Sequence, residues 1–133
     1  TAIGDAVNLS SRIESLCKNY HVPIIISEDT KTRIHDRFLT RKLDRVRVKG
    51  KNIPVNIYQL LPNNEKNRHL CQQFKSALSA YFDAEFTQAR ARFQQLEAQC
   101  HDQVSSLFYE RCNLYENSPP AADWDGVFVC SQK

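Results

Sequence analysis

Residues 39–61 read LTRKLDRVRVKGKNIPVNIYQLL, and this stretch decides the fold class. Residues 39–49 read as a strand, in which Val46 and Val48 point one way and Arg45, Arg47 and Lys49 point the other. Gly50 lies in the short polar turn that follows, where a glycine can adopt a positive φ. A second apolar strand pattern runs from Ile53 to Leu61. The stretch therefore predicts a β-hairpin.

The residues before the hairpin predict a helix, a strand and a second, short helix. Apolar residues recur at three- and four-residue steps from Asp5 to Tyr20, which is typical of an amphipathic helix. The run from Pro23 to Ser27 is short, apolar and rich in β-branched residues, so it indicates a buried strand. Ser27 can cap a helix that ends near Asp36. This order predicts an α+β domain with helices on one face of an antiparallel sheet.

Beyond Pro62 the apolar residues follow a helical period, so we place a boundary there. We divide the chain into residues 1–61, an all-α helical-hairpin tail at 62–117, and a C-terminal segment at 118–133. The tail is expected to form three helices. Their apolar stripes are Leu70, Phe74, Leu78 and Tyr81, then Phe86, Ala89, Phe93 and Leu96, then Val104, Leu107, Phe108, Arg111, Cys112 and Tyr115.

The tail is expected to pack against another surface. The spacing of Ala89 and Phe93 resembles the second helix of a tetratricopeptide unit, and a single such unit cannot bury its own apolar face. Pro119 and Pro120 end the last helix. Residues 123–128, DWDGVF, are too apolar for a free tail, so we expect them to dock.

Composition and charge narrow the class of protein. The chain has 133 residues, 41% of them apolar and 25% charged, which is ordinary for a soluble globular protein. Residues 1–61 hold 11 Lys and Arg against 6 Asp and Glu, so the first half is basic and suggests an anionic partner. The five cysteines form no CxxC pair and the histidines are dispersed, which argues against a disulfide framework and a zinc site.

Two further features concern the extent and location of the chain. No apolar run approaches the roughly 20 residues of a transmembrane helix, and no signal peptide is visible. The chain begins at Thr1 and contains no Met, so we expect a piece of a longer protein. We expect a cytoplasmic location, and upstream segments of the parent protein could anchor it to a membrane.

Asn8 and Arg12 form the first chemical feature. In the predicted helix they lie four residues apart on one edge, beside the apolar stripe. An Arg guanidinium matches phosphate oxygens with two parallel hydrogen bonds, so this pair could bind a phosphate in a cleft. The alternative is a solvated helix face.

The second chemical feature is a basic strand face formed by Arg45, Arg47 and Lys49, next to Lys51. It either contacts phosphate or is an exposed face whose charges protect the sheet edge. A nucleic-acid interface is the weaker interpretation, because such a sheet face normally carries stacking aromatics and none stands between these residues.

Together and in this order, these stretches resemble the class III nucleotide cyclases. Residues 1–12, TAIGDAVNLSSR, resemble that family's signature helix, except that Ser10 stands where Ala is usual. Residues 22–27, VPIIIS, and 43–58, LDRVRVKGKNIPVNIY, resemble the strand and the closing hairpin that follow. The resemblance covers residues 1–61 and implies the C-terminal half of a ferredoxin-like catalytic domain. The remainder is similar to helical extensions of some bacterial cyclases.

The resemblance implies roles for four residues. Asn8 would orient the ribose, and Arg12 would bind the α-phosphate as charge builds in the transition state. Lys49 would hold the phosphates toward the leaving pyrophosphate. Thr1 falls where the family reads the purine edge, and Thr there accompanies adenine. The implied reaction converts ATP to 3′,5′-cyclic AMP and pyrophosphate in intracellular signalling, with a guanylate cyclase as the alternative.

The resemblance also implies partners and cofactors. Two Mg²⁺ or Mn²⁺ ions would be held by Asp residues upstream of Thr1. The family's site forms between two catalytic domains, so a homodimer is expected and this piece alone should be inactive. A competing hypothesis is a helical protein-interaction module on a degenerate cyclase scaffold, with a protein partner for the tail. Nucleic acid is not an expected partner.

Overall fold

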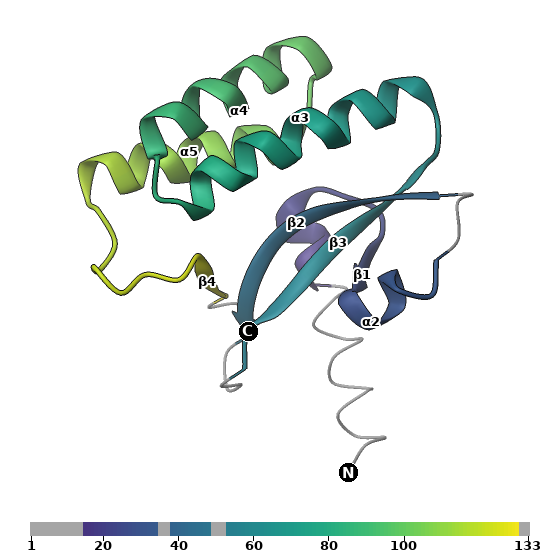
Figure 1. Ribbon diagram of the computed structural model, residues 1–133, viewed down its shortest axis with the longest axis horizontal. Helices are drawn as coiled ribbons and strands as arrows, with labels where there is room; N and C mark the ends of the chain where they lie inside the picture. Colours follow the sequence, from purple (N-terminus) through teal and green to yellow (C-terminus); the bar gives the residue numbers. More distant parts are fainter. Residues whose placement is uncertain (1–14, 35–37, 49–52, 131–133) are drawn as a thin grey trace.

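The computed structural model describes residues 15–34, 38–48 and 53–130, which form a sheet with helices packed against it (Figure 1). Residues 15–20 are helical, and the short helix α2 follows the first strand. The strand order in the sheet is β1-β3-β2-β4. The elements are β1 (Ile25–Ser27), α2 (Glu28–Lys31), β2 (Phe38–Val48), β3 (Val55–Pro62), α3 (Glu65–Phe82), α4 (Phe86–Cys100), α5 (Gln103–Asn117) and β4 (Val127–Cys130).

Strands β2 and β3 form the predicted antiparallel hairpin. Arg41 pairs with Gln59 and Asp44 pairs with Ile57, and the register shifts between them. The shift leaves Leu43 as an extra residue, a β-bulge. Because Gln59 and Ile57 are two positions apart on β3, their partners Arg41 and Asp44 face the same side of the sheet. The bulge thus turns two charged side chains toward the helices.

The elements before the hairpin follow the prediction with shorter bounds. Helical residues 15–20 end at His21, whose φ is +58°. Strand β1 begins at Ile25, two residues after Pro23, and pairs antiparallel with β3. Ser27 caps α2 as expected, its Oγ accepting a hydrogen bond from the Thr30 N–H at 3.2 Å. The helix ends at Lys31 and not near Asp36, because the last turn closes through Thr30 and Lys31 carbonyls.

The three helices of the tail bury most of the stripes expected of them, and Leu70, Leu107 and Tyr115 are partly buried. Among the fully buried residues are Phe74, Leu78, Tyr81, Phe86, Ala89, Phe93, Leu96, Val104, Phe108, Arg111 and Cys112. Helix α3 begins after Asn64, whose side chain accepts from the Asn67 N–H at 2.8 Å. The predicted boundary at Pro62 falls where β3 ends and the chain turns into this helix.

The C-terminal segment docks, as its composition predicted, but in an unexpected form. Strand β4 pairs parallel with β2, so the sheet is not wholly antiparallel. Before β4, the Trp124 ring lies 5.3 Å from the rings of Tyr81 and Phe86 and 5.7 Å from that of Tyr115, measured between centroids. The segment therefore links the sheet to the helical layer.

Sheet and tail share one hydrophobic core. It includes Leu16 and Tyr20 from the first helical segment, Val46 from β2, and the buried stripes of α3, α4 and α5. None of the helices in the described ranges is long and apolar enough to cross a bilayer. The ferredoxin-like architecture implied by the resemblance remains a prediction.

Candidate functional site

The four residues given roles by the resemblance are Thr1, Asn8, Arg12 and Lys49, and all of them lie outside the described residues. The structure instead describes what adjoins them in sequence: helical residues 15–20 and the two strands of the hairpin. The contacts of these elements indicate how the predicted site would be supported.

A buried polar cluster joins the end of the first helix to the sheet and the tail. Asp44 on β2 is fully buried. Its Oδ2 accepts a hydrogen bond from the Tyr20 hydroxyl at 2.6 Å and from Arg111 Nη1 at 2.6 Å. Its Oδ1 accepts from the Arg45 N–H at 2.8 Å, and Arg111 Nη1 also donates to the Tyr81 hydroxyl at 3.2 Å. One carboxylate thus connects β2, helical residues 15–20 and α5.

The electrostatics of this cluster indicate a structural role. Burial raises the pKa of Asp44, whereas the Arg111 guanidinium and the Tyr20 hydroxyl lower it. Burial also raises the pKa of the Tyr20 hydroxyl well above its ordinary value, so it stays a donor. The Arg111 guanidinium lies 4.5 Å from the Phe108 ring centroid and 3.8 Å from that of Phe128. Enclosed in this way, Asp44 and Arg111 hold elements together.

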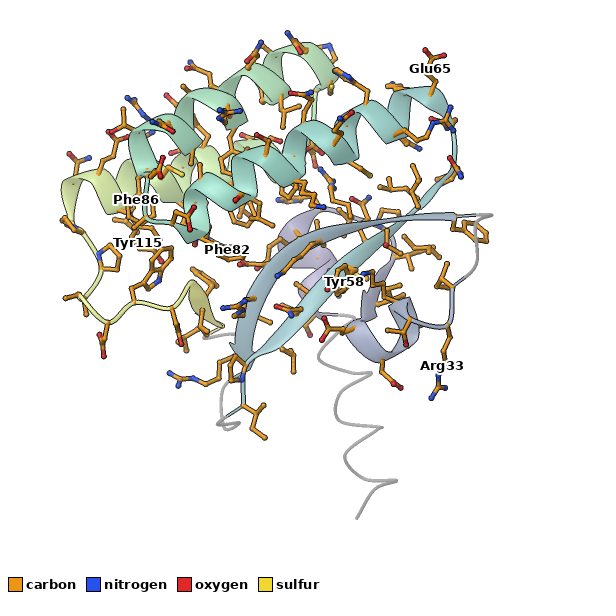
Figure 2. The ribbon with its side chains drawn as sticks, in the orientation of Figure 1. Arg33, Tyr58, Glu65, Phe82, Phe86 and Tyr115 are labelled. Carbon is orange, nitrogen blue, oxygen red and sulfur yellow. The ribbon has the colours of Figure 1, made fainter. Side chains whose placement is uncertain are left out.

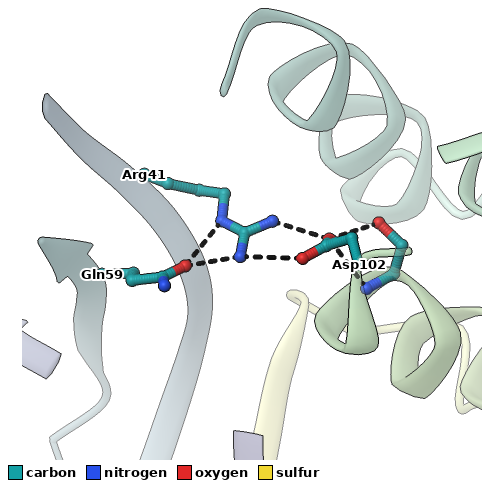
Figure 3. A network of polar contacts seen from close by, with 4 residues as sticks. Arg41, Gln59 and Asp102 are labelled. Atoms are coloured by element: carbon teal, nitrogen blue, oxygen red, sulfur yellow. Dashed lines mark hydrogen bonds and ion pairs between the residues drawn. The ribbon is translucent and has the colours of Figure 1, made fainter. Parts of the chain in front are cut away.

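A second buried ion pair ties the sheet to the start of α5 (Figure 3). Arg41 Nη1 donates to Asp102 Oδ2 at 2.7 Å, and Nη2 donates to Oδ1 at 3.2 Å. Arg41 Nε donates to Gln59 Oε1 at 3.0 Å, so one guanidinium spans β2, β3 and α5. Asp102 also caps α5, accepting from the Ser105 N–H at 3.1 Å and its hydroxyl at 2.6 Å.

Only one of these pairs could be suspected in part from the sequence. Arg111 is the charged member of an otherwise apolar helical stripe, and a buried guanidinium requires a carboxylate partner. Nothing in the sequence identifies Asp44 as that partner, because it lies 67 positions away and reaches the helices only through the bulge. Nothing in the sequence predicts the ion pair between Arg41 and Asp102.

The basic strand face divides between two environments. Arg45 is partly buried, and its Nη1 donates to the Asp125 carbonyl at 3.0 Å while its Nε donates to Asn56 Oδ1 at 3.4 Å. Arg47 is exposed. Lys49 and Lys51 lie outside the described residues. Arg45 therefore anchors the C-terminal segment, which favours the structural interpretation for this residue over the phosphate contact.

No metal site is formed by the residues in 15–34, 38–48 and 53–130. No group of three or more His, Cys, Asp and Glu side chains within these ranges is arranged to hold an ion. The Mg²⁺ or Mn²⁺ ions implied by the resemblance therefore find no ligand cluster among the described residues.

Comparison with known proteins gives three relevant relatives. The chain is 33% identical over 121 residues to "Adenylate cyclase, terminal-differentiation specific" of Dictyostelium discoideum, a match that covers 84% of this chain and 6% of that protein. It is 43% identical over 63 residues to an adenylate cyclase of Anabaena cylindrica, covering 45% of this chain and 12% of the relative. It is 31% identical over 61 residues to adenylate cyclase 1 of Rhizobium meliloti (strain 1021), covering 46% of this chain and 9% of that relative.

These matches have a defined extent. The chain spans only 6% to 12% of the length of these relatives. A match over 84% of the chain cannot fit within residues 1–61, so the similarity to the Dictyostelium protein includes part of the helical tail. No model of a known protein family matches the chain, and no solved structure does. By these three relatives, the chain is related to adenylate cyclases.

Proposed function

We propose that this chain is the C-terminal half of a ferredoxin-like adenylate cyclase catalytic domain with a helical extension, in a protein that converts ATP to 3′,5′-cyclic AMP and pyrophosphate. The observation that carries the proposal is the match to a protein named adenylate cyclase over 84% of the chain. The antiparallel hairpin of β2 and β3 supports it, because the family resemblance rests partly on that hairpin.

The proposed reaction is an in-line attack of the ribose 3′-hydroxyl on the α-phosphorus, with pyrophosphate as the leaving group. Arg12 would neutralise the charge that develops on the α-phosphate, where a preorganised donor has its largest effect. Asn8 would orient the ribose, so that the hydroxyl is held near the phosphorus. Lys49 would bind the phosphates that leave, and Thr1 would contact adenine.

We propose that metal ions would be held by residues outside the described ranges. Mg²⁺ or Mn²⁺ would neutralise phosphate charge and activate the attacking hydroxyl. Because the described residues contain no cluster of metal-ligating side chains, these ions would be held by other residues. Following the family resemblance, we propose a site shared between two catalytic domains, with Asn8 and Arg12 contributed by this half, and no activity from this chain alone.

The alternative, a protein-interaction module on an inactive scaffold, is less well supported. The apolar stripes of α3, α4 and α5 pack in one core with the chain's own sheet. Two buried ion pairs, Arg41 with Asp102 and Arg111 with Asp44, fasten this tail to β2. Helices used in this way have little apolar surface left for a separate protein partner.

Replacing Arg12 tests the proposed function. In the complete protein, Arg12→Ala should lower kcat by about 10²–10³ and change KM for ATP little, because the lost interaction strengthens in the transition state. Arg12→Lys should not restore the rate, since an ammonium lacks the planar fork of donors. Steady-state assays with ATP and GTP measure both effects, and a higher kcat/KM for GTP would select the guanylate cyclase alternative.

A matched control is available in the exposed turn that follows helix α2. Arg33 pairs with Asp29 at 3.3 Å with both side chains more than three-quarters exposed, so Arg33→Ala should leave turnover unchanged. Near-wild-type turnover of Arg12→Ala would assign that residue to a solvated helix face and contradict the proposed site.

A further inference from the structure

A cavity of about 640 Å³ lies between α3 and the neighbouring part of strand β2. Strand β4 pairs with β2 only from Arg45 onward. Consequently no strand within the described ranges covers the outer edge of β2 before that residue. Helix α3 runs beside β2 (Figure 1). Residues of both elements line the cavity.

Three lysines from three different elements line this cavity: Lys31 from α2, Lys42 from β2 and Lys75 from α3. In the ranges that the structure describes, none of the ion pairs involves these three ammonium groups. The lining contains a carboxylate, Asp83, at the end of α3. Arg41 also lines the cavity, but its guanidinium is already neutralised by Asp102. The cavity therefore carries an excess of positive charge.

Two of these ammonium groups lie over aromatic rings. Lys31 Nζ is 5.1 Å from the centroid of the Tyr58 ring, and Lys42 Nζ is 5.1 Å from that of the Phe82 ring. Figure 2 shows Phe82 at the end of α3 and Tyr58 on the sheet. Burial, and then the charge of nearby Arg45, lowers the pKa of Lys42. The carboxylates of Glu28 and Asp44 oppose this shift, but neither forms an ion pair with Lys42 in the described ranges. An anion in the cavity would further offset the cost of this partly desolvated ammonium.

Apolar side chains of α3 line another part of the cavity, beside the polar residues Thr40, Gln72 and Ser79. Phe74 and Leu78 of α3 are buried residues whose side chains contribute to the lining, and Phe82 extends the same face of the helix. Cations on one side and apolar groups on the other select a ligand that has both an anionic and an apolar part. Inorganic phosphate alone would leave the apolar wall without a contact.

We propose that this cavity binds a small organic anion, with a phosphate or carboxylate group held by Lys31, Lys42 and Lys75 and an apolar group against Leu78 and Phe82. The lining residues include none of the four residues assigned to ATP. The site does not depend on the cyclase activity, since it is built wholly from described residues of α2, β2, β3 and α3.

Phenyl phosphate is a suitable probe because it combines a ring with a phosphate. Calorimetric titration of the full chain should give saturable binding of phenyl phosphate. The dissociation constant should lie below about 10 mM, which is the range of a small fragment. Inorganic phosphate should bind more weakly, and neutral benzyl alcohol should not show saturable binding. Equal binding of benzyl alcohol would indicate an apolar groove only and would overturn the proposal.

Variants locate the binding. Lys42→Gln should weaken phenyl phosphate binding by about tenfold without lowering the melting temperature, because Lys42 forms no ion pair with the described residues. Lys66→Gln, which alters an exposed lysine of α3 outside the lining, should leave binding unchanged. Arg12→Ala should also leave it unchanged. Loss of binding in Arg12→Ala, or full binding in Lys42→Gln, would place the probe elsewhere and refute the cavity site.

Discussion

Replacing Arg111 with Met should destabilise the protein by about 3–5 kcal/mol, the usual penalty for leaving a buried charge without its partner. Arg111 is 7% exposed and Asp44 is not exposed at all, so solvent does not screen the pair. In the variant, Asp44 would keep only the Tyr20 hydroxyl and the Arg45 N–H as donors. Loss of the guanidinium contact with Phe128, at 3.8 Å, would add a smaller cost.

The loss of stability caused by Arg111→Met should depend on pH. Without the guanidinium, nothing of opposite charge opposes the burial that raises the pKa of Asp44. A carboxyl whose pKa is higher in the folded state stabilises the fold below its unfolded-state pKa, and that stability is lost as pH rises through the folded-state pKa. The difference in the free energy of unfolding between Arg111→Met and wild type should therefore be larger at about pH 7 than at about pH 5.

Urea unfolding followed by fluorescence measures these free energies, because Trp124 is the single tryptophan and packs beside Tyr81. Combining Asp44→Asn with Arg111→Met removes both charges and should recover at least half of the loss. As a control, Arg92→Met alters an exposed side chain bonded to a serine hydroxyl and should stay within about 0.5 kcal/mol of wild type. A loss below about 1 kcal/mol, or one that is independent of pH, would refute this account of the pair.

Two further predictions concern the contacts between sheet, helices and C-terminal segment. Gly126→Ala should lower the free energy of unfolding by about 1–3 kcal/mol, because φ is +86° there and a Cβ would lie 2.6 Å from the Phe82 ring; an unchanged urea midpoint would contradict it. Asp102→Asn should cost about 3–5 kcal/mol by leaving Arg41 buried without a charge partner. Asp29→Asn, at an exposed ion pair, is the control and should not shift the midpoint.

Local sequence rules were sufficient for most of the elements. The alternation around Val46, the capping hydroxyl of Ser27 and the helical stripe containing Phe93 all depend on neighbours within a few positions. Each is confirmed by the structure. The length of α2 was predicted less well, because Ile34 is the single apolar residue in 28–36 and no apolar period marks an end.

Long-range pairings were not predictable in the same way. The four residues of β4 read VFVC, which indicates an apolar segment but not its partner, direction or register. The bulge at Leu43 likewise depends on how β3 aligns with β2. For the site, the roles of Asn8 and Arg12 are predicted from the family resemblance, since their spacing alone also fits a solvated helix face. Their roles stay predictions.

The parallel pairing of β4 with β2 has a consequence for how the protein folds. The contact between Arg45 and the Asp125 carbonyl spans 80 positions, whereas the hairpin and the helical pairs close over short loops. Closing a long loop is entropically expensive, so contacts of this kind form slowly. During synthesis β2 emerges long before β4, so the outer edge of β2 stays unpaired until β4 has been made. A chaperone that covers such an edge would act on the nascent chain in that interval.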